Sequence, residues 1–286
     1  MIAEKYSIKE LMAACCSREI KNGERVFVGI GLPMMSAIIA QNTHAKDSVF
    51  VYEGGGVGGR SRRVPWSIAD NPTAENALMI HEMWRLFSDQ QAGYIDRGVI
   101  GGAQVDKFGN LNTTVIFGKN GTYKDPKIRL PGSGGANDIG SSAGETTIIM
   151  NLEKGKFVEK IDYMTTPGHL TGGHARKKAG LVGNGPTSLI CQKCVFRFDP
   201  ETKEMYLDTL FPGVTIEEVK ALVDWELKVA KDVKEVEPPH QVHIDIIKQY
   251  DPKGIMLGAK SNEEESFDEF FELMKQAYES VTLELH

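Results

Sequence analysis

The most constraining feature of this sequence is a recurring unit, in which a short apolar run ends in glycine and is followed by a helical pattern. Residues 25–31 (RVFVGIG) form the first such run, and Pro33 then stands in the first turn of the helix that follows. Residues 48–56 (SVFVYEGGG) repeat the pattern, and residues 99–106 and 146–152 read as further strands. Strands that alternate with helices in this way predict an α/β fold, with a mostly parallel open sheet and helices on both faces.

The pattern changes near residue 215. Residues 215–254 read as a helix, a proline break and a second helix, with no strand to add to the sheet. Residues 261–281 (SNEEESFDEFFELMKQAYESV) read as an acidic amphipathic helix. We therefore expect an α/β domain over residues 1–214 and a helical C-terminal extension over residues 215–286, which packs on that domain or on a partner.

Composition and charge exclude several classes of function. A formal net charge of −6 argues against a nucleic-acid binder, because phosphate contacts call for a basic surface. No apolar run approaches the roughly 20 residues of a membrane span, and the N-terminal residues lack a signal-peptide pattern. The four cysteines are too few for a disulfide scaffold in a chain of 286 residues. We expect a cytoplasmic protein that binds neither nucleic acid nor membrane.

Motifs for metal binding and for serine hydrolysis are weak or missing. Cys191 and Cys194 have the spacing of half a zinc site, but neither a second such pair nor a matching histidine pair follows. We interpret them as structural or incidental thiols and expect no metal. His169 and His174 flank the run LTGG and read as surface or hydrogen-bonded histidines. No G-x-S-x-G motif is present.

Two glycine-rich loops are candidate binding elements. Gly29 and Gly31 follow a strand and open a helix, but Met34 occupies the third glycine position of a dinucleotide fingerprint, so the match to an NAD or ATP site is weak. The turn still suits an anion, because a helix N-terminus offers unpaired N–H groups. Residues 131–145 (PGSGGANDIGSSAGE) form the second loop. This run is either a flexible loop or a place where backbone N–H groups approach a ligand closely.

Glu53 is the strongest catalytic candidate. It follows the apolar run at residues 48–52, at the strand end where ligands bind in α/β sheets, and five of the next six residues are glycine. An acid in this position is often a solvated turn residue or a helix N-cap. An exposed turn, however, does not require so many glycines. A carboxylate nucleophile does suit such surroundings, because it must reach a carbonyl carbon whose oxyanion is met by backbone donors.

From about Arg25 to Pro212 the chain resembles the B (β) subunit of family I CoA-transferases, and most closely that of glutaconate CoA-transferase. The order and spacing of several motifs together carry this resemblance. They are VGIGLP, VYEGG, VIGGAQVDKFGNLN, RLPGSGGANDI, TTIIMNLEKGKFVEKIDYMTTPG and FDPETKEMYL. The segment after residue 215 fits the tail of these subunits more loosely.

The resemblance implies a mechanism for Glu53. In the family, the matching glutamate attacks an acyl-CoA thioester and gives an acyl-glutamyl anhydride, which the CoA thiolate converts into an enzyme–CoA thioester. An incoming carboxylic acid then reverses these steps and leaves as the new acyl-CoA. Water destroys every one of these intermediates, so surrounding Glu53 with backbone rather than hydrated side chains suits the chemistry.

The resemblance and the glycine patterns together assign the other site residues. The expected residues that bind coenzyme A are Gly29, Gly31, Gly134, Gly135 and Ala136, and the expected substrate-binding residues are Gln104, Asn112 and Arg60. In the family, the loop that matches residues 134–136 places its amides against the reacting carbonyl. The arginines of the GRSRRVP run are either partners for a substrate carboxylate or a CoA phosphate, or solvated or interface side chains.

The sequence thus predicts the β subunit of a CoA-transferase, which works with a separate α subunit, as α2β2, on short or dicarboxylic acids. A second hypothesis is a C–C hydrolase or decarboxylase of CoA thioesters from the same superfamily. A third is a ligand-sensing domain without catalysis, which rests on fold analogy alone.

Overall fold

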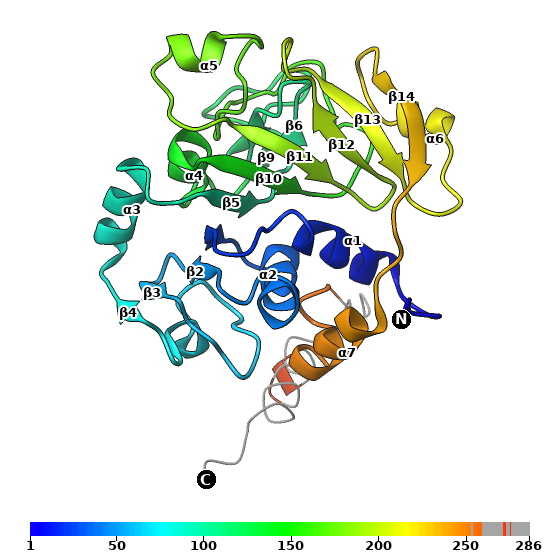
Figure 1. The fold of residues 1–286 in the computed structure, drawn as a ribbon. Helices are drawn as coiled ribbons and strands as arrows, with labels where there is room; N and C mark the ends of the chain where they lie inside the picture. The colour runs from blue at the N-terminus through cyan, green and yellow to red at the C-terminus, as the bar shows by residue number, and fades with distance from the viewer. Residues whose placement is uncertain (253, 259–270, 273–274, 276–286) are drawn as a thin grey trace. The chain divides into compact units, whose positions relative to one another are not determined.

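The computed structural model describes residues 1–252, 254–258, 271–272 and 275 (Figure 1). The chain divides into two compact units. Unit 1 comprises residues 1–86 and 238–286, and unit 2 comprises residues 87–237. This division differs from the boundary that we expected after residue 214, because the chain leaves unit 1 once and returns to it at Pro238.

In the part of unit 1 that precedes residue 253, three α-helices pack on one another beside short strands. The helices are α1 (Ile8–Ser17), α2 (Leu32–Asn42) and α7 (Gln241–Tyr250), and the other elements are β1 (Arg25–Val28), β2 (Val49–Val51), β3 (Gly56–Val57), η1 (Asn71–Ala74) and β4 (Met79–Ile80). Helix α3 (Met83–Gln91) continues into unit 2. Helices α1, α2 and α7 are in mutual contact (Figure 1). The start of α1 is fixed by a capping box between Ser7 and Glu10.

Strands β1 and β2 of unit 1 correspond to the first two apolar runs that the sequence predicts as strands. Strands β1 and β2 pair in parallel, with Val26 opposite Phe50, and both side chains are fully buried. Strands β3 and β4 continue the sheet in antiparallel order. The connection between β1 and β2 runs through α2, as expected for parallel neighbours.

Unit 2 is built on a larger sheet. Its strands are β5 (Arg97–Ile100), β6 (Gln104–Val105), β7 (Leu111–Asn112), β8 (Val115–Ile116), β9 (Ile128–Arg129), β10 (Glu145–Ile149), β11 (Pro186–Ile190), β12 (Cys194–Phe198), β13 (Met205–Leu210) and β14 (Lys228–Glu235). Its helices are α4 (Ala136–Ser142), α5 (Ala175–Lys178) and α6 (Ile216–Lys220). The main strand order in this unit is β14-β13-β12-β11-β10-β5. The pairs β6–β7 and β8–β9 form two small separate sheets.

The predicted α/β class with parallel strands is confirmed. Strands β5, β10 and β11 pair in parallel, and their apolar residues, such as Val99, Ile148 and Leu189, are buried. Strands β12 and β13 extend this sheet in antiparallel order. The GGAQ motif, residues 101–104, follows the carboxyl end of β5, and the segment that begins at Met150 follows the carboxyl end of β10.

The prediction that residues 215–254 contain no strand is wrong. Residues 228–235 form β14, which pairs in parallel with β13. Five of the eight residues of this strand are charged, namely three lysines, one aspartate and one glutamate, and the strand lies at the end of the strand order, so no apolar alternation marked it in the sequence. The helical parts of the prediction correspond to α6 and α7. The acidic helix expected over residues 261–281 lies almost entirely outside the described residues.

The singled-out histidine and cysteines have structural positions in unit 2. The His169 ring hydrogen-bonds the Pro186 carbonyl at 2.8 Å and meets Phe198 edge-on, and burial lowers the pKa of His169 to about 4. This confirms the hydrogen-bonded interpretation of His169. The sulfurs of Cys191 and Cys194 are buried and lie 3.4 Å apart.

The described residues contain neither a metal-binding cluster nor a membrane-spanning helix. No cluster of three or more histidine, cysteine, aspartate or glutamate side chains in the described part of the chain is arranged to hold a metal ion. Likewise, no helix within the same residues has both the length and the apolar character needed to cross a membrane.

Candidate active site

Glu53 lies in a tight turn at the carboxyl end of β2. The Tyr52 N–H donates to the Gly56 carbonyl at 2.9 Å, and the Gly55 N–H donates back to the Tyr52 carbonyl at 2.9 Å. Glu53 therefore occupies the second position of a hydrogen-bonded turn and is half-buried. Tyr52 is 2% exposed, and its burial raises the pKa of the phenol. The turn is thus anchored in the core directly before the candidate nucleophile.

The glycines after Glu53 are required by backbone packing. A β carbon on Gly54 would lie 2.5 Å from the Ile68 carbonyl oxygen, and one on Gly56 would lie 2.1 Å from that of Thr73. A β carbon on Gly55 would meet the His81 carbonyl oxygen at 2.1 Å, and the φ of Gly55 is +115°. Segments far along the chain therefore press directly on this turn. Their close approach gives the glycines a packing role, whether or not the turn also excludes water.

Gly55→Ala should destabilise unit 1 by about 2–5 kcal/mol. The positive φ contributes roughly 1–2 kcal/mol, and the contact with the His81 carbonyl adds an overpacking cost of about 1–3 kcal/mol. Urea unfolding of the purified chain measures the change. Gly23→Ala is the matched control, since Gly23 also has a positive φ, +83°, but nothing lies within 4 Å of an added β carbon. Equal losses in both variants would contradict the packing account.

The arginines after the glycine turn have partners inside unit 1. Arg62 forms an ion pair with Glu75, and Arg63 lies 3.6 Å from Asp70. Burial alone would raise the pKa of Glu75, but hydrogen bonds from the Arg62 N–H and guanidinium hold that pKa below its usual range. The Arg60 guanidinium donates to the Lys46 carbonyl and is exposed. Arg60 therefore differs from Arg62 and Arg63, because its guanidinium bonds a backbone carbonyl while theirs lie beside carboxylates.

Gly29 and Gly31 form the turn between β1 and α2. Gly31 is the N-cap residue of α2 with a φ of +81°, and its carbonyl accepts the Met35 N–H at 3.1 Å. The strand–glycine–helix turn that the sequence predicts is therefore present. Unit 1 thus contains four of the predicted site residues, namely Glu53, Gly29, Gly31 and Arg60.

Gln104 and Asn112 lie opposite each other on β6 and β7 of unit 2. The Asn112 amide donates to the Gln104 side-chain oxygen at 2.7 Å and to the Val115 carbonyl at 2.6 Å. Its own oxygen accepts the N–H groups of Thr114 and Val115. These bonds use the two donors and two acceptor positions of a side-chain amide. Asn112 therefore holds the turn between β7 and β8 and positions Gln104.

A buried carboxylate fixes the turn that joins β6 to β7. Asp106 accepts the backbone N–H of Phe108 at 2.9 Å and the side-chain amide of Asn110 at 2.8 Å. Asn110, fully buried, donates from the same amide to the Leu170 carbonyl. Burial raises the pKa of Asp106, and the hydrogen bonds oppose this effect. These hydrogen bonds fix the turn that joins the two strands on which Gln104 and Asn112 lie.

The second glycine loop borders a cavity of about 350 Å³ in unit 2. Residues that line it come from the GGAQ motif, the β7–β8 turn and the loop before α4, and they are Gly102, Ala103, Thr113, Leu130, Pro131, Gly132, Ser133 and Ala136. Gly132 and Gly134 have φ angles of +105° and +48°, and open space surrounds an added β carbon at both. Two motifs well separated in the sequence therefore meet at one cavity.

Hydrogen bonds hold this loop in place. The Gly132 N–H donates to the Thr113 carbonyl at 2.9 Å, and the Thr113 hydroxyl donates to the Gly132 carbonyl at 2.8 Å. The Leu130 N–H donates to the Thr114 carbonyl at 3.0 Å. This arrangement favours the ligand-approach interpretation of the loop over a flexible one. The sequence did not identify Gly102, Thr113 and Leu130 as lining residues. Gly102 belongs to the GGAQ motif, which was the one signal for it.

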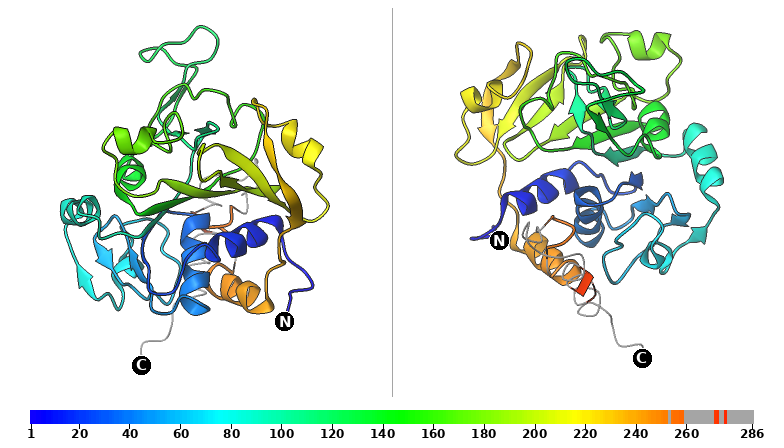
Figure 2. Two further views of the ribbon diagram at one scale, coloured as in Figure 1. Left: turned by 45° about the horizontal axis from the view of Figure 1, so that its top comes forward. Right: turned by 180° about the vertical axis from the view of Figure 1, so that it is seen from behind.

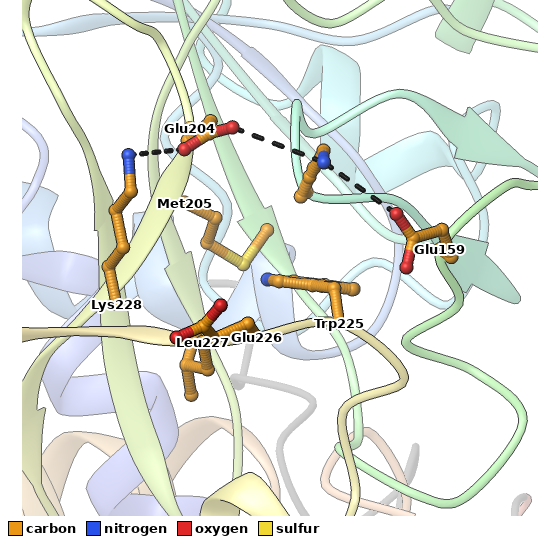
Figure 3. Close-up of a pocket in the computed structure, with 8 residues that line it drawn as sticks. Glu159, Glu204, Met205, Trp225, Glu226, Leu227 and Lys228 are labelled. Carbon is orange, nitrogen blue, oxygen red and sulfur yellow. Dashed lines mark ion pairs between the residues drawn. The ribbon is translucent and has the colours of Figure 1, made fainter.

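A larger cavity of about 460 Å³ lies elsewhere in unit 2 (Figure 3). Its lining consists mainly of charged side chains and is made up of Lys107, Glu159, Glu204, Met205, Trp225, Glu226, Leu227 and Lys228. Lys107 lies 3.7 Å from Glu159 and 4.0 Å from Glu204, and Glu204 also pairs with Lys228. Figure 3 shows Glu204 with an ion pair on each side. None of the predicted site residues lines this cavity.

The chain belongs to the coenzyme A transferase family. The sequence profile of that family, described as coenzyme A transferase, matches residues 9–222. The chain is 41% identical over 244 residues to the B subunit of the 3-oxoadipate CoA-transferase of Pseudomonas knackmussii, a match that covers 85% of this chain and 92% of that one. It is 36% identical over 250 residues to the B subunit of the glutaconate CoA-transferase of Acidaminococcus fermentans, with 85% and 92% covered.

The solved structure of one CoA-transferase supports the same assignment. The crystal structure of glutaconate coenzyme A-transferase from Acidaminococcus fermentans matches with a TM-score of 0.81 and 34% identity, over 90% of this chain and 99% of that one. The decarboxylase AibA/AibB matches with a TM-score of 0.74 over 88% of this chain and 98% of that one, but at 18% identity. The second similarity shows the fold alone. The resemblance to CoA-transferases and the predicted enzyme class are thereby confirmed.

Proposed function

We propose that this chain is the β subunit of a CoA-transferase that moves CoA from an acyl-CoA to a free carboxylic acid through a glutamyl-CoA thioester on Glu53. The observation that carries the proposal is Glu53 itself. A single carboxylate stands at the end of β2, in a turn that neighbouring backbone fixes, within a chain of the coenzyme A transferase family. A nucleophile needs this kind of fixed position to meet a thioester carbonyl.

The chemistry follows from the properties of a carboxylate. A Glu53 oxygen attacks the thioester carbonyl and CoA leaves as its thiolate, which gives an acyl-glutamyl anhydride. The thiolate attacks the glutamyl carbonyl, and the first acid leaves as its carboxylate. The second acid attacks the glutamyl thioester, which expels the CoA thiolate and forms a new anhydride. The thiolate then attacks the acyl carbonyl of that anhydride, which releases the new acyl-CoA and the Glu53 carboxylate. No net proton, electron or water is consumed in this exchange.

The other predicted residues support this chemistry as binding groups. In unit 2, Gly134, Gly135 and Ala136 belong to the loop at the 350 Å³ cavity, where backbone groups and small residues leave room for part of the acyl-CoA. Gln104 is held by Asn112 and is the residue of that pair that we assign to substrate contact. Gly29 and Gly31 offer an anion-binding turn in unit 1.

We assign a dicarboxylic acid as the acceptor or donor. The two relatives described above are named for 3-oxoadipate and glutaconate, which are both dicarboxylates. A second carboxylate needs a cationic partner, and we assign this role to Arg60, which is exposed and whose guanidinium bonds the Lys46 carbonyl. Since both relatives are named as the B subunits of their enzymes, we also propose an A-subunit partner, in an α2β2 assembly.

The test is a CoA-exchange assay of the chain with its A subunit. Succinyl-CoA serves as the donor and unlabelled C5 and C6 dicarboxylates serve as acceptors, with the thioester products separated by chromatography. The proposal expects one new acyl-CoA for each succinate released, with free CoA and CO₂ at background. Stoichiometric CO₂ or free CoA without a new thioester would instead support the decarboxylase or hydrolase hypothesis.

A further inference from the structure

An exposed basic loop joins β8 to β9 in unit 2. Residues 117–129 contain four basic residues and one acidic residue, although the whole chain has a formal net charge of −6. Lys119, Lys124 and Lys127 are all exposed, and within the part of the chain that the structure describes none of the three forms an ion pair. The loop projects at the top of the left view of Figure 2. Uncompensated positive charge of this kind attracts anions.

Two exposed tyrosines stand beside this charge. Tyr123 and Tyr163 are 53% and 40% exposed, and their ring centroids lie 5.8 Å apart with an interplanar angle of 38°. The Arg129 guanidinium carbon lies 4.7 Å from the Tyr123 ring centroid, and the same guanidinium donates to the Tyr123 carbonyl. A tyrosine face beside a guanidinium is a surface on which a nucleobase stacks.

Hydrogen bonds connect these residues to the candidate site of unit 2. The Asp162 carboxylate, next to Tyr163, accepts the Phe117 N–H at 2.9 Å. The Asp162 N–H in turn donates to the Gln104 side-chain oxygen at 3.2 Å. At the other end of the loop, Arg129 directly precedes Leu130, which lines the 350 Å³ cavity. The basic loop is therefore fixed to both Gln104 and the cavity wall.

We propose that this cluster is the nucleotide subsite for the acyl-CoA. Its members are Lys119, Tyr123, Lys124, Lys127, Arg129 and Tyr163. The adenine stacks on the tyrosines, while the lysines and the guanidinium bind the 3′-phosphate and the diphosphate. The inference rests on the proposed function, because it assigns the far end of the same substrate.

The reach of the substrate agrees with this assignment. Gly132 in the cavity lining and Arg129 are three residues apart, a separation of at most about 11 Å along the chain. The pantetheine arm has two amide units and a pantoyl group, so its extended length is roughly that of four to five residues, about 15 Å. A CoA whose thiol end enters the cavity can therefore place its diphosphate and adenosine on the cluster.

The experiment is calorimetric titration of the chain, assembled with its A subunit, with CoA, dephospho-CoA, adenosine 3′,5′-bisphosphate and pantetheine. Two variants are compared with the wild type, Tyr123→Ala and the double variant Lys124→Ala/Lys127→Ala. We expect each to bind CoA and the bisphosphate about 5- to 100-fold more weakly, with pantetheine binding unchanged. In the wild type, loss of the 3′-phosphate should weaken binding, and in the lysine variant this difference should shrink.

Matched controls and a separate readout make the outcomes distinct. Tyr94→Ala removes a tyrosine that is 56% exposed, and Lys154→Ala removes an exposed lysine, both within unit 2 but outside the cluster. CoA affinity equal to wild type in both cluster variants would overturn the subsite. So would failure of these variants, but not of the controls, to assemble with the A subunit. Cluster-dependent CoA binding without any transfer activity would retain the subsite and remove the proposed function.

Discussion

Glu53→Gln should lower CoA transfer by the assembled enzyme by about four to six orders of magnitude, the range seen when a covalent nucleophile or its essential partner is removed. The amide keeps the size of the side chain, so the turn between Tyr52 and Gly56 is retained. It lacks a carboxylate oxygen that can form the anhydride, so no glutamyl thioester follows. The exchange assay with succinyl-CoA and a dicarboxylate measures the loss.

Two controls separate chemistry from folding in this experiment. Glu4→Gln makes the same substitution at an exposed glutamate of unit 1 and should leave transfer unchanged. The urea midpoint of Glu53→Gln should lie close to that of the wild type, in contrast to Gly55→Ala. A stable Glu53→Gln enzyme that retains a tenth or more of the wild-type transfer rate would contradict the nucleophile assignment.

The isolated chain should show less than about 1% of the transfer rate of the assembled enzyme, because an incompletely enclosed or misplaced acyl-glutamyl group reacts with water before an acid captures it. The two relatives described above are each named as the B subunit of their enzyme. Titration of the A subunit into a fixed concentration of the chain should restore transfer until the two are equimolar.

The control for this titration is the A subunit added to the Glu53→Gln chain, which should restore nothing. Circular dichroism of the isolated chain confirms that it is folded before the partner is added. Full turnover by the wild-type chain without any partner would contradict the heteromeric assembly, and would mean that copies of this chain complete the site themselves.

The parts of the fold that follow from local pattern were predictable from the sequence. The apolar run at residues 25–28 needs only its β-branched residues and the following glycines to be recognised as a strand that leads into a helix. The same reasoning placed Glu53 at the end of the strand that became β2. Both predictions rest on residues that are adjacent in the sequence, so no distant contact was needed to make them.

Features that depend on distant contacts were not predictable from the sequence alone. The glycines at residues 54–56 are required by carbonyl groups of Ile68, Thr73 and His81, and no local pattern identifies these partners. Strand β14 forms by pairing with β13, while its own charged residues, three lysines, one aspartate and one glutamate, are typical of a solvated helix. In both cases tertiary packing decides a conformation that local composition leaves open.

The same limit applies to side chains in the candidate site. The sequence placed Asn112 among the substrate-binding residues, whereas its amide is fully used in bonds to Gln104, Val115 and Thr114. Hydrogen-bond saturation of this kind depends on the register of β6 against β7, which pairs Gln104 with Asn112. A polar residue in a motif can therefore serve to hold a neighbouring side chain, as Asn112 holds Gln104.

Covalent trapping tests the central claim most directly. The assembled enzyme is incubated with an acyl-CoA, treated with borohydride and digested with trypsin, which releases residues 47–60 as one peptide between Lys46 and Arg60. Borohydride reduces a thioester to a primary alcohol, so the account predicts loss of activity together with the corresponding mass decrease, localised by fragmentation to Glu53. Loss of activity with Glu53 unmodified, or the same reduction at another carboxylate, would contradict it.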